Sequence, residues 1–309
     1  MSLGVVCHAI KVVKTRTGLK EINLFENRTL QLGRFTAGEY SHEKIYDMYV
    51  HNASKVLEVL PILADEGVKL YRLSSDLLPL ADKIDPAIWD TTHIRGIYKK
   101  IGDLCRARKI RVTMHPAQFC VLNSESESVI QNAVRDMQHH AWVLDACEFD
   151  ESPTYAINIH AGRRDRFAEL VQNIEKLPGN VRSRLTFENC ETVASVEELL
   201  PVSEKTGCPI VFDSHHHTFR PGSLTLDAAL DLAMCTWSSD IKPLQHIANT
   251  EPDLVNGNFV DRRKHSKFIH YVPARQLNLL RDDAVDCEVE AKAKQLAVYK
   301  MATDFGIDL

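Results

Sequence analysis

The segment 209-PIVFD-213 contains, within five residues, the pattern from which the fold can be inferred. Large apolar side chains at 210 to 212 form a run of the length of a buried strand, and the run ends on Asp213. Three histidines follow at 215 to 217, after one serine. A carboxylate and imidazoles directly after a buried strand indicate that functional side chains gather where this strand ends.

Short apolar runs alternate with longer amphipathic segments along the whole chain. The expected strands are Leu3–Val6, Lys69–Leu73, Arg111–Met114, Tyr155–Ile159, Arg184–Phe187, Pro209–Phe212, Pro243–Ile247 and Val285–Val289. The expected helices include His42–Glu66, Ile88–Lys109, Glu127–Cys147, Ser195–Thr206, Thr225–Met234 and Ala291–Thr303. This alternation indicates parallel βαβ units, and eight strands in 309 residues predict a closed (β/α)8 TIM barrel, a single domain over residues 1–309. An open doubly wound sheet is the alternative, but no glycine-rich loop follows the first expected strand.

Six of the eight expected strands finish on, or contain near their end, a histidine or a carboxylate: His115, His160, Glu188, Asp213, His246 and Glu290. The carboxyl ends of barrel strands meet at one face, so these six groups are expected to converge there. Imidazole and carboxylate together suit zinc, manganese or iron. We expect His216, three residues after Asp213, to turn back toward the same place, and His215 and His217 to point elsewhere.

Composition restricts the setting in which the protein works. Apolar residues are 44% and charged residues 26% of the chain, typical of a globular protein, and no apolar run has the length of a membrane span. The first ten residues resemble a strand more than a signal peptide, and the eight cysteines are scattered singly, which favours reduced thiols inside the cell. A net charge of −5 does not exclude a nucleic-acid partner, because basic residues cluster at 11–16, 106–111, 163–166 and 262–267.

At the level of motifs the chain resembles the UV damage endonuclease family, TIM-barrel DNA-repair enzymes similar in plan to endonuclease IV. The matching stretches are 71-YRLSSDLLP-79, 111-RVTMHPAQFCVLNS-124, 184-RLTFENCE-191, 210-IVFDSHHH-217, 250-TEP-252, 265-HSKFI-269 and 287-CEVEAKAK-294. The resemblance implies an intracellular, cytoplasmic enzyme, nucleoid-associated when it acts, whose substrate is damaged double-stranded DNA. It implies a nick immediately 5′ to the lesion that leaves 3′-hydroxyl and 5′-phosphate ends. No protein partner and no membrane are expected.

The resemblance also implies a metal centre, and manganese is the expected ion, although the ligand types alone permit zinc. Its ligands fall on His115, His160, Glu188, Asp213, His216, His246, His265 and Glu290. By analogy with endonuclease IV, His115, His160 and Glu188 hold one ion. Glu188 bridges to a second ion held with Asp213, His246 and Glu290. Glu188, Glu290 and His246 are the expected catalytic residues.

Two further expectations come from the resemblance. Gln118 and Phe119 match a wedge that enters the duplex beside a damaged dinucleotide, and Arg72 and Asn123 are expected on the DNA or lesion side. A third metal position has only His216 and His265 as clear ligands, because Arg263 and Leu244 stand where a carboxylate and a modifiable lysine would otherwise add donors. We therefore expect two firmly held ions and a third that is weak or absent before DNA binds.

Two other functions fit the same pattern of residues. A metal-dependent sugar isomerase or epimerase of the xylose isomerase-like barrel group would use the same histidines and carboxylates on a polyol. It would not need the 118–119 loop or the basic clusters. A barrel that only binds damaged DNA and recruits other factors is the non-enzymatic alternative, and the complete ligand set speaks against it.

Overall fold

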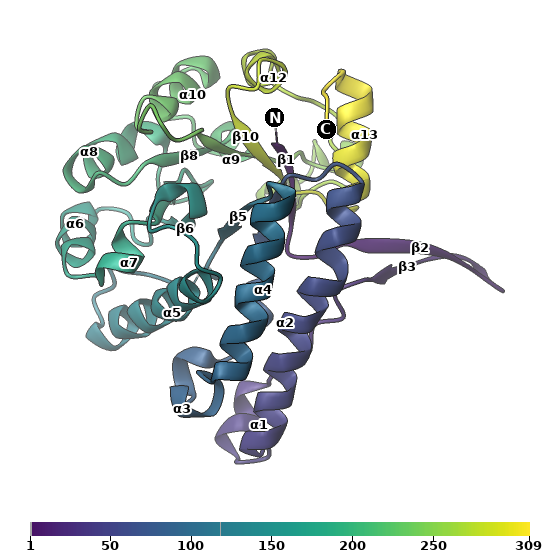
Figure 1. Ribbon diagram of the computed structural model, residues 1–309. Coiled ribbons are helices and arrows are strands. Elements are labelled where there is room, and N and C mark those ends of the chain that lie inside the picture. The colour runs from purple at the N-terminus through teal and green to yellow at the C-terminus, as the bar shows by residue number, and fades with distance from the viewer. Residues whose placement is uncertain (1, 118) are drawn as a thin grey trace.

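The computed structural model describes residues 2–117 and 119–309, and eight of its strands form a closed parallel barrel (Figure 1). Around the barrel each strand pairs with its neighbours in the order β1-β10-β9-β8-β7-β6-β5-β4, and β1 pairs with β4 to close the ring. The strands are β1 (Ser2–Val6), β4 (Leu70–Leu73), β5 (Arg111–Met114), β6 (Ile157–His160), β7 (Leu185–Glu188), β8 (Ile210–Asp213), β9 (Leu244–Ile247) and β10 (Asp286–Val289). The predicted (β/α)8 TIM barrel is confirmed, and every expected strand overlaps an observed one.

The register of the strands places the expected ligands at one level of the barrel. His160 lies opposite Glu188 across the β6–β7 pair, and Asp213 lies opposite His246 across the β8–β9 pair. Side chains on neighbouring parallel strands at the same height are within reach of one another when both point inward. The pairing therefore converts four separate strand ends into a common site.

Helices surround the barrel, and the larger ones are α2 (His42–Asp65), α4 (Thr92–Arg108), α5 (Glu127–Ala146), α6 (Phe167–Glu175), α8 (Val196–Thr206), α10 (Leu226–Met234), α12 (Ala274–Arg281) and α13 (Gln295–Phe305). Helix α8 shows why the predicted bounds were close, because a capping box of Ser195 and Glu198 starts it and Gly207, at a φ of 72°, ends it. No helix among the described residues is long and apolar enough to cross a bilayer.

The prediction was wrong at one place in the helical layer. The helix expected from Ile88 is interrupted, since α3 (Pro86–Trp89) ends before Thr91 caps the start of α4 through the backbone N–H of Ile94. Helices α6 and α12 were not among the helices named from sequence; they are only nine and eight residues long, and their apolar pattern is brief. The remaining short helices are α1 (Leu32–Thr36), α7 (Gly179–Arg182), α9 (Ser214–Phe219) and α11 (Phe259–Arg262).

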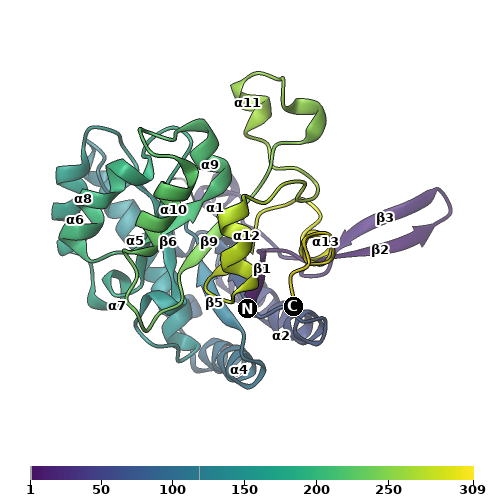
Figure 2. The ribbon, with the colours of Figure 1, turned by 90° about the horizontal axis from the view of Figure 1, so that it is seen from above.

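An antiparallel hairpin that the sequence analysis did not predict leaves the barrel after β1. Its strands, β2 (Ile10–Thr15) and β3 (Gly18–Asn23), form a separate two-stranded sheet. In both ribbon views the hairpin projects away from the helices (Figures 1 and 2). Gly18 at its turn has a φ of 130°, a conformation that other residues rarely adopt. We propose that the barrel and this hairpin make up one domain, as one core of buried residues runs from Leu3 to Ile307 and Gln295 bonds the first hairpin strand at Ile10.

Candidate metal centre and nucleic-acid interface

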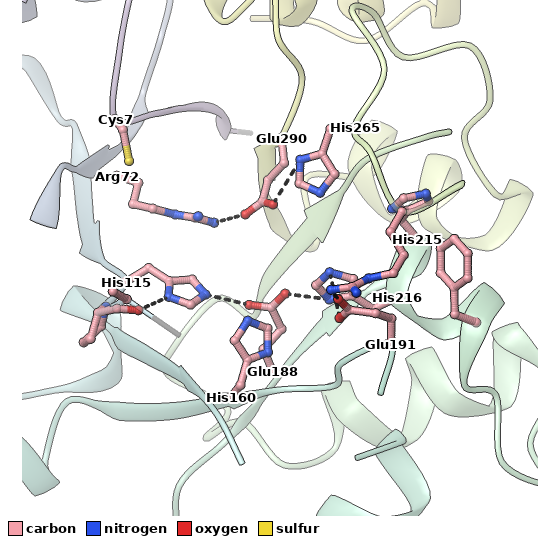
Figure 3. Close-up of a pocket in the computed structure, with 14 residues that line it drawn as sticks. Cys7, Arg72, His115, His160, Glu188, Glu191, His215, His216, His265 and Glu290 are labelled. Carbon is pink, nitrogen blue, oxygen red and sulfur yellow. Dashed lines mark hydrogen bonds and ion pairs between the residues drawn. The ribbon is translucent and has the colours of Figure 1, made fainter. Parts of the chain in front are cut away.

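A cavity of about 320 Å³ opens at the carboxyl ends of the barrel strands, and Glu188 lies at its floor (Figure 3). One carboxylate oxygen of Glu188, Oε2, is 3.1 Å from His115 Nε2 and also 3.1 Å from His246 Nδ1. The other oxygen, Oε1, is 3.0 Å from His216 Nδ1. Glu188 is only 1% exposed, so a buried acid is surrounded by imidazoles from three other parts of the chain.

The charges of this group depend on one another. Burial alone would raise the pKa of Glu188, but the nearby imidazoles, His246 first among them, hold it well below its usual value. Burial would lower the pKa of His246, but the attraction of Glu188 outweighs it and raises that pKa to about 10. The site thus keeps its acids ionised and requires positive charge beside them.

The three consecutive histidines point in three directions because they lie on a short helix. Asp213 caps α9 by accepting a hydrogen bond of 2.6 Å from the backbone N–H of His216. His216 faces Glu188. His215 lines the wall of the cavity, and its Nε2 lies 3.1 Å from Thr250 Oγ1. His217 packs against the Phe212 ring, away from the cavity, with 5.7 Å between ring centroids.

Arg72 on β4 occupies the side of the cavity opposite His216. Its guanidinium donates to Glu288 Oε2 from Nε at 2.6 Å and to Glu290 Oε1 from Nη2 at 2.5 Å. It also lies 3.0 Å from His246 Nε2. Although burial would raise the pKa of Glu288, Arg72 and His246 lower it to about 2. At 8% exposure Arg72 lies on the floor of the site, and its expected contact with DNA stays a prediction.

Two acidic residues of the site were missed by the sequence analysis. Glu288 lies on β10, two residues before Glu290, which directly follows the strand, and this spacing of two could have revealed it. Glu191 lines the cavity wall, forms an ion pair with Arg263 and places its Oε2 at 3.6 Å from His216 Nε2. Arg263, expected to weaken a third metal position, thus has its charge matched by Glu191.

His265 is the outermost of the predicted ligands. It comes from the long segment between β9 and α12, its side chain is 33% exposed, and its Nδ1 lies 3.7 Å from Glu290 Oε2. It lines the same cavity as His216, but its ring is closer to the solvent. Leu244 is buried in β9 at 1% exposure, so it contributes no donor to this position.

The loop after β5 carries the residues expected to meet DNA. Phe119 is 87% exposed, whereas Gln118 lies outside the described residues. Asn123 is fully buried, and its amide bonds the backbone of Arg163 and the carbonyl of Arg166. Gly162 permits this approach, since a Cβ there would lie 2.3 Å from Asn123 Oδ1. The structure therefore gives Asn123 a role in holding two loops together, and a direct contact with DNA is not what its position favours.

Three groups of donors in the barrel mouth could each hold a metal ion. In each group the donor atoms lie within 4.8 Å of one another: His115, His160, Glu188; Glu188, Asp213, His216; and His246, Glu288, Glu290. The first group is the set expected for the first ion. Asp213, expected with His246 and Glu290, instead lies in a group with His216.

The chemistry of these donors fits a divalent cation. Asp213 Oδ2 is buried and has no hydrogen-bond partner among the residues that the structure describes. An ionised oxygen in that position is costly unless a cation or a donor meets it. Buried carboxylates and imidazole nitrogens at one spot are the ligands of zinc, manganese and iron sites, and an ion that binds there takes the place of the imidazole protons. The fold and site together define a (β/α)8 barrel protein with histidine–carboxylate groups that could hold metal ions at the carboxyl face of the strands.

Comparisons with known proteins place the chain within that class. A family model described as UV-endonuclease UvdE matches residues 1–308. The UV DNA damage endonuclease of Nostoc sp. is 33% identical over 303 residues, which cover 96% of this chain and 88% of that protein. The UV DNA damage endonuclease of Deinococcus radiodurans is 33% identical over 280 residues, 88% of each chain. The chain belongs to the UV-endonuclease UvdE family, and it is an endonuclease that acts on UV-damaged DNA.

Solved structures agree with this placement. The crystal structure of SacUVDE matches 100% of both chains with a TM-score of 0.80 and 26% identity. L-ribulose 3-epimerase has a TM-score of 0.53 at 14% identity and covers 82% of this chain and 81% of its own, which shows a shared barrel plan alone. The family resemblance is confirmed. The alternative of a sugar isomerase or epimerase is supported by the shared fold alone.

Proposed function

We propose that this endonuclease uses divalent metal ions, manganese first among them, to hydrolyse the phosphodiester bond immediately 5′ to a lesion in double-stranded DNA. The products would be a 3′-hydroxyl and a 5′-phosphate. The observation that carries the proposal is the position of Glu188. It is a buried carboxylate within 3.1 Å of imidazoles from β5, α9 and β9, at the floor of an open cavity.

Glu188 has the geometry of a bridging ligand, because its two oxygens face different imidazoles. Oε2 faces His115 and His246, and Oε1 faces His216. Ions held by Glu188 and the groups around it would supply Lewis-acid activation of water and positive charge beside the scissile phosphate. His246 is fully buried between Glu188 and Glu288, so it has a fixed orientation toward the floor of the site.

The protein's own charges prepare the site for a phosphodiester. Arg72 neutralises Glu288 and Glu290 and, against the effect of burial, lowers the pKa of both carboxyl groups. Glu290 therefore stays an ionised oxygen donor at neutral pH. His265, a third exposed at the rim of the cavity, is placed to donate a hydrogen bond to a phosphate oxygen that enters from solvent.

Recognition of the lesion would come from the loop after β5. Phe119 presents an aromatic ring that is 87% exposed, from a loop whose earlier residues, Pro116 and Ala117, line the cavity. A solvent-exposed ring costs free energy unless a partner covers it, and a base that has lost its stacking neighbour offers a matching face. Damage lowers the cost of unstacking, so selectivity for damaged steps follows.

The test is to incubate the purified protein with irradiated and with untreated supercoiled plasmid, with Mn²⁺ and with a chelator. The expected result is nicking of irradiated plasmid with Mn²⁺ only. Labelled duplex with one defined lesion then locates the cut and its end groups. Equal nicking of both plasmids would refute lesion recognition, full activity in chelator would refute the metal centre, and a cut 3′ to the lesion would refute the proposed polarity.

A further inference from the structure

The β2–β3 hairpin begins at the rim of the cavity. Strand β1 ends at Val6, and the next residue, Cys7, lines the cavity wall. The hairpin starts three residues later, at Ile10, on the carboxyl side of the barrel where the metal centre lies. In both ribbon views the hairpin projects sideways from the barrel, so its outer half lies away from the helices that surround the strands (Figures 1 and 2).

The base of the hairpin is fastened to the barrel by specific contacts. Gln295 at the start of α13 accepts a hydrogen bond of 2.9 Å from the Ile10 backbone N–H and donates one of 2.5 Å to the Ile10 carbonyl. Asn23 Nδ2 lies 3.1 Å from His8 Nδ1, and Lys267 forms an ion pair of 2.7 Å with Glu21. The direction of the hairpin relative to the cavity is therefore fixed at its base.

The outer half of the hairpin has a surface without a core of its own. Leu19 is 78% exposed there, and Val12, nearer the base, is 42% exposed. A lone two-stranded ribbon in water is at best marginally stable, so a partner that covers this surface would stabilise it. The hairpin carries four exposed basic side chains, Lys11, Lys14, Arg16 and Lys20, and one acidic side chain, Glu21. Its local charge is therefore +3, in a chain whose net charge is −5.

The arrangement of these charges favours a polyanion over an apolar partner. Cross-strand pairing places Lys14 beside Leu19 and Val13 beside Lys20, so each apolar side chain of the outer half lies next to a cation. A partner with an apolar patch would have to strip water from these ammonium groups without replacing it. Phosphate oxygens meet the cations directly, and binding then releases counterions.

We propose that the β2–β3 hairpin is an arm that enters a groove of the duplex beside the lesion and binds phosphates on both sides of that groove. The strand pairing places Lys14 on one face of the ribbon and Lys20 on the other, with Arg16 at the turn between the strands. The proposal rests on the proposed function, because it takes damaged DNA as the occupant of the cavity. Six residues per strand extend roughly 20 Å, which corresponds to roughly six base pairs of duplex. The arm thus lengthens the footprint on one flank only.

The test compares a hairpin variant with a matched control on two duplexes. The variant is Lys14→Gln/Arg16→Gln/Lys20→Gln. The control, Lys176→Gln/Arg182→Gln/Lys205→Gln, removes three exposed cations from segments that precede β7 and β8, at the other end of the barrel. Affinity is measured for a lesion duplex with long flanks and for duplexes trimmed on either side to about three base pairs, half the proposed reach of the arm.

We expect the hairpin variant to bind the long duplex at least about tenfold more weakly than wild type at 0.1 M salt. Its log–log salt slope should be smaller by about 2 to 3, since each lost phosphate contact removes about 0.9. Trimming one flank, and not the other, should abolish the difference from wild type, and the control should bind as wild type does. Circular dichroism and thermal unfolding of both variants report on folding.

Unchanged affinity on the long duplex would overturn the proposal, and so would a loss that is equal on the long and on both trimmed duplexes. A wild-type protein that does not distinguish damaged from undamaged DNA would refute the proposed function instead. In that case undamaged duplexes of the same lengths still decide the role of the hairpin, because phosphate contacts do not depend on the lesion.

Discussion

Replacing Phe119 by alanine should separate recognition of the lesion from general binding of DNA. The ring is 87% exposed, so its removal deletes almost no packing, and the free energy of unfolding should change by less than about 0.5 kcal/mol. If the ring stacks on a base beside the lesion, its loss costs about 1–3 kcal/mol of binding. The affinity for a lesion duplex should therefore fall about 5- to 150-fold.

The assay is fluorescence anisotropy at one fixed salt concentration, in a Glu188→Gln background so that the duplex is not cut. Undamaged duplex of the same sequence should be bound with unchanged affinity, because that binding depends on phosphate contacts. Phe119→Tyr should retain most of the affinity for the lesion, and Phe119→Leu, which keeps apolar volume without a π face, should not. Equal losses on damaged and undamaged duplex would show that the ring is structural and refute the wedge.

The other predictions concern the metal centre and the stability of the fold. Glu188→Ala and Glu290→Ala should each lower the nicking rate by at least about a hundredfold while near-native circular dichroism persists, and near-normal turnover in either variant would contradict a shared metal centre. After dialysis without DNA, wild type and His216→Ala should both retain two ions per chain by elemental analysis. Three ions in wild type and two in His216→Ala would show that His216 holds a tightly bound third ion. His139 on α5 is buried, and burial holds the pKa of its imidazole well below the usual value. As pH falls below about 6.5, therefore, only the unfolded chain binds a proton at this residue. For each pH unit below about 6.5, the free energy of unfolding of wild type should therefore fall by up to about 1.4 kcal/mol more than that of His139→Leu. Urea denaturation with metal chelated measures both free energies. The same dependence on pH in the two proteins would exclude this contribution of His139.

The barrel and most of the candidate ligands could be predicted from sequence because both depend on short local patterns. Buried parallel strands are apolar runs of four or five residues, and the segments that cover them have helical periodicity. A polar residue at the end of such a run belongs at the carboxyl face whatever the partners of that strand are. Asp213, Glu188 and His160 are therefore visible in the sequence one strand at a time.

The grouping of those ligands was decided by tertiary structure. Asp213 lies in a group with His216 and Glu188 because Asp213 caps α9 and the helix turns His216 back toward Glu188. Arg72 approaches Glu290 from a strand more than two hundred positions away in sequence. Distances of this kind follow from barrel closure and register, and no local pattern in the chain encodes them.

The sequence by itself determined which segments are barrel strands, where each of them ends to within one residue and which side chains stand at those ends, because hydrophobic periodicity and chain direction are local properties. Only the tertiary structure decided that Asn123 is buried between two loops, that Glu191 joins the site beside Arg263, and that residues 10–23 leave the barrel as a hairpin. Each of these depends on what meets the residue across the fold. Burial, ion pairing and strand pairing are properties of two segments at once, and one segment cannot specify them alone.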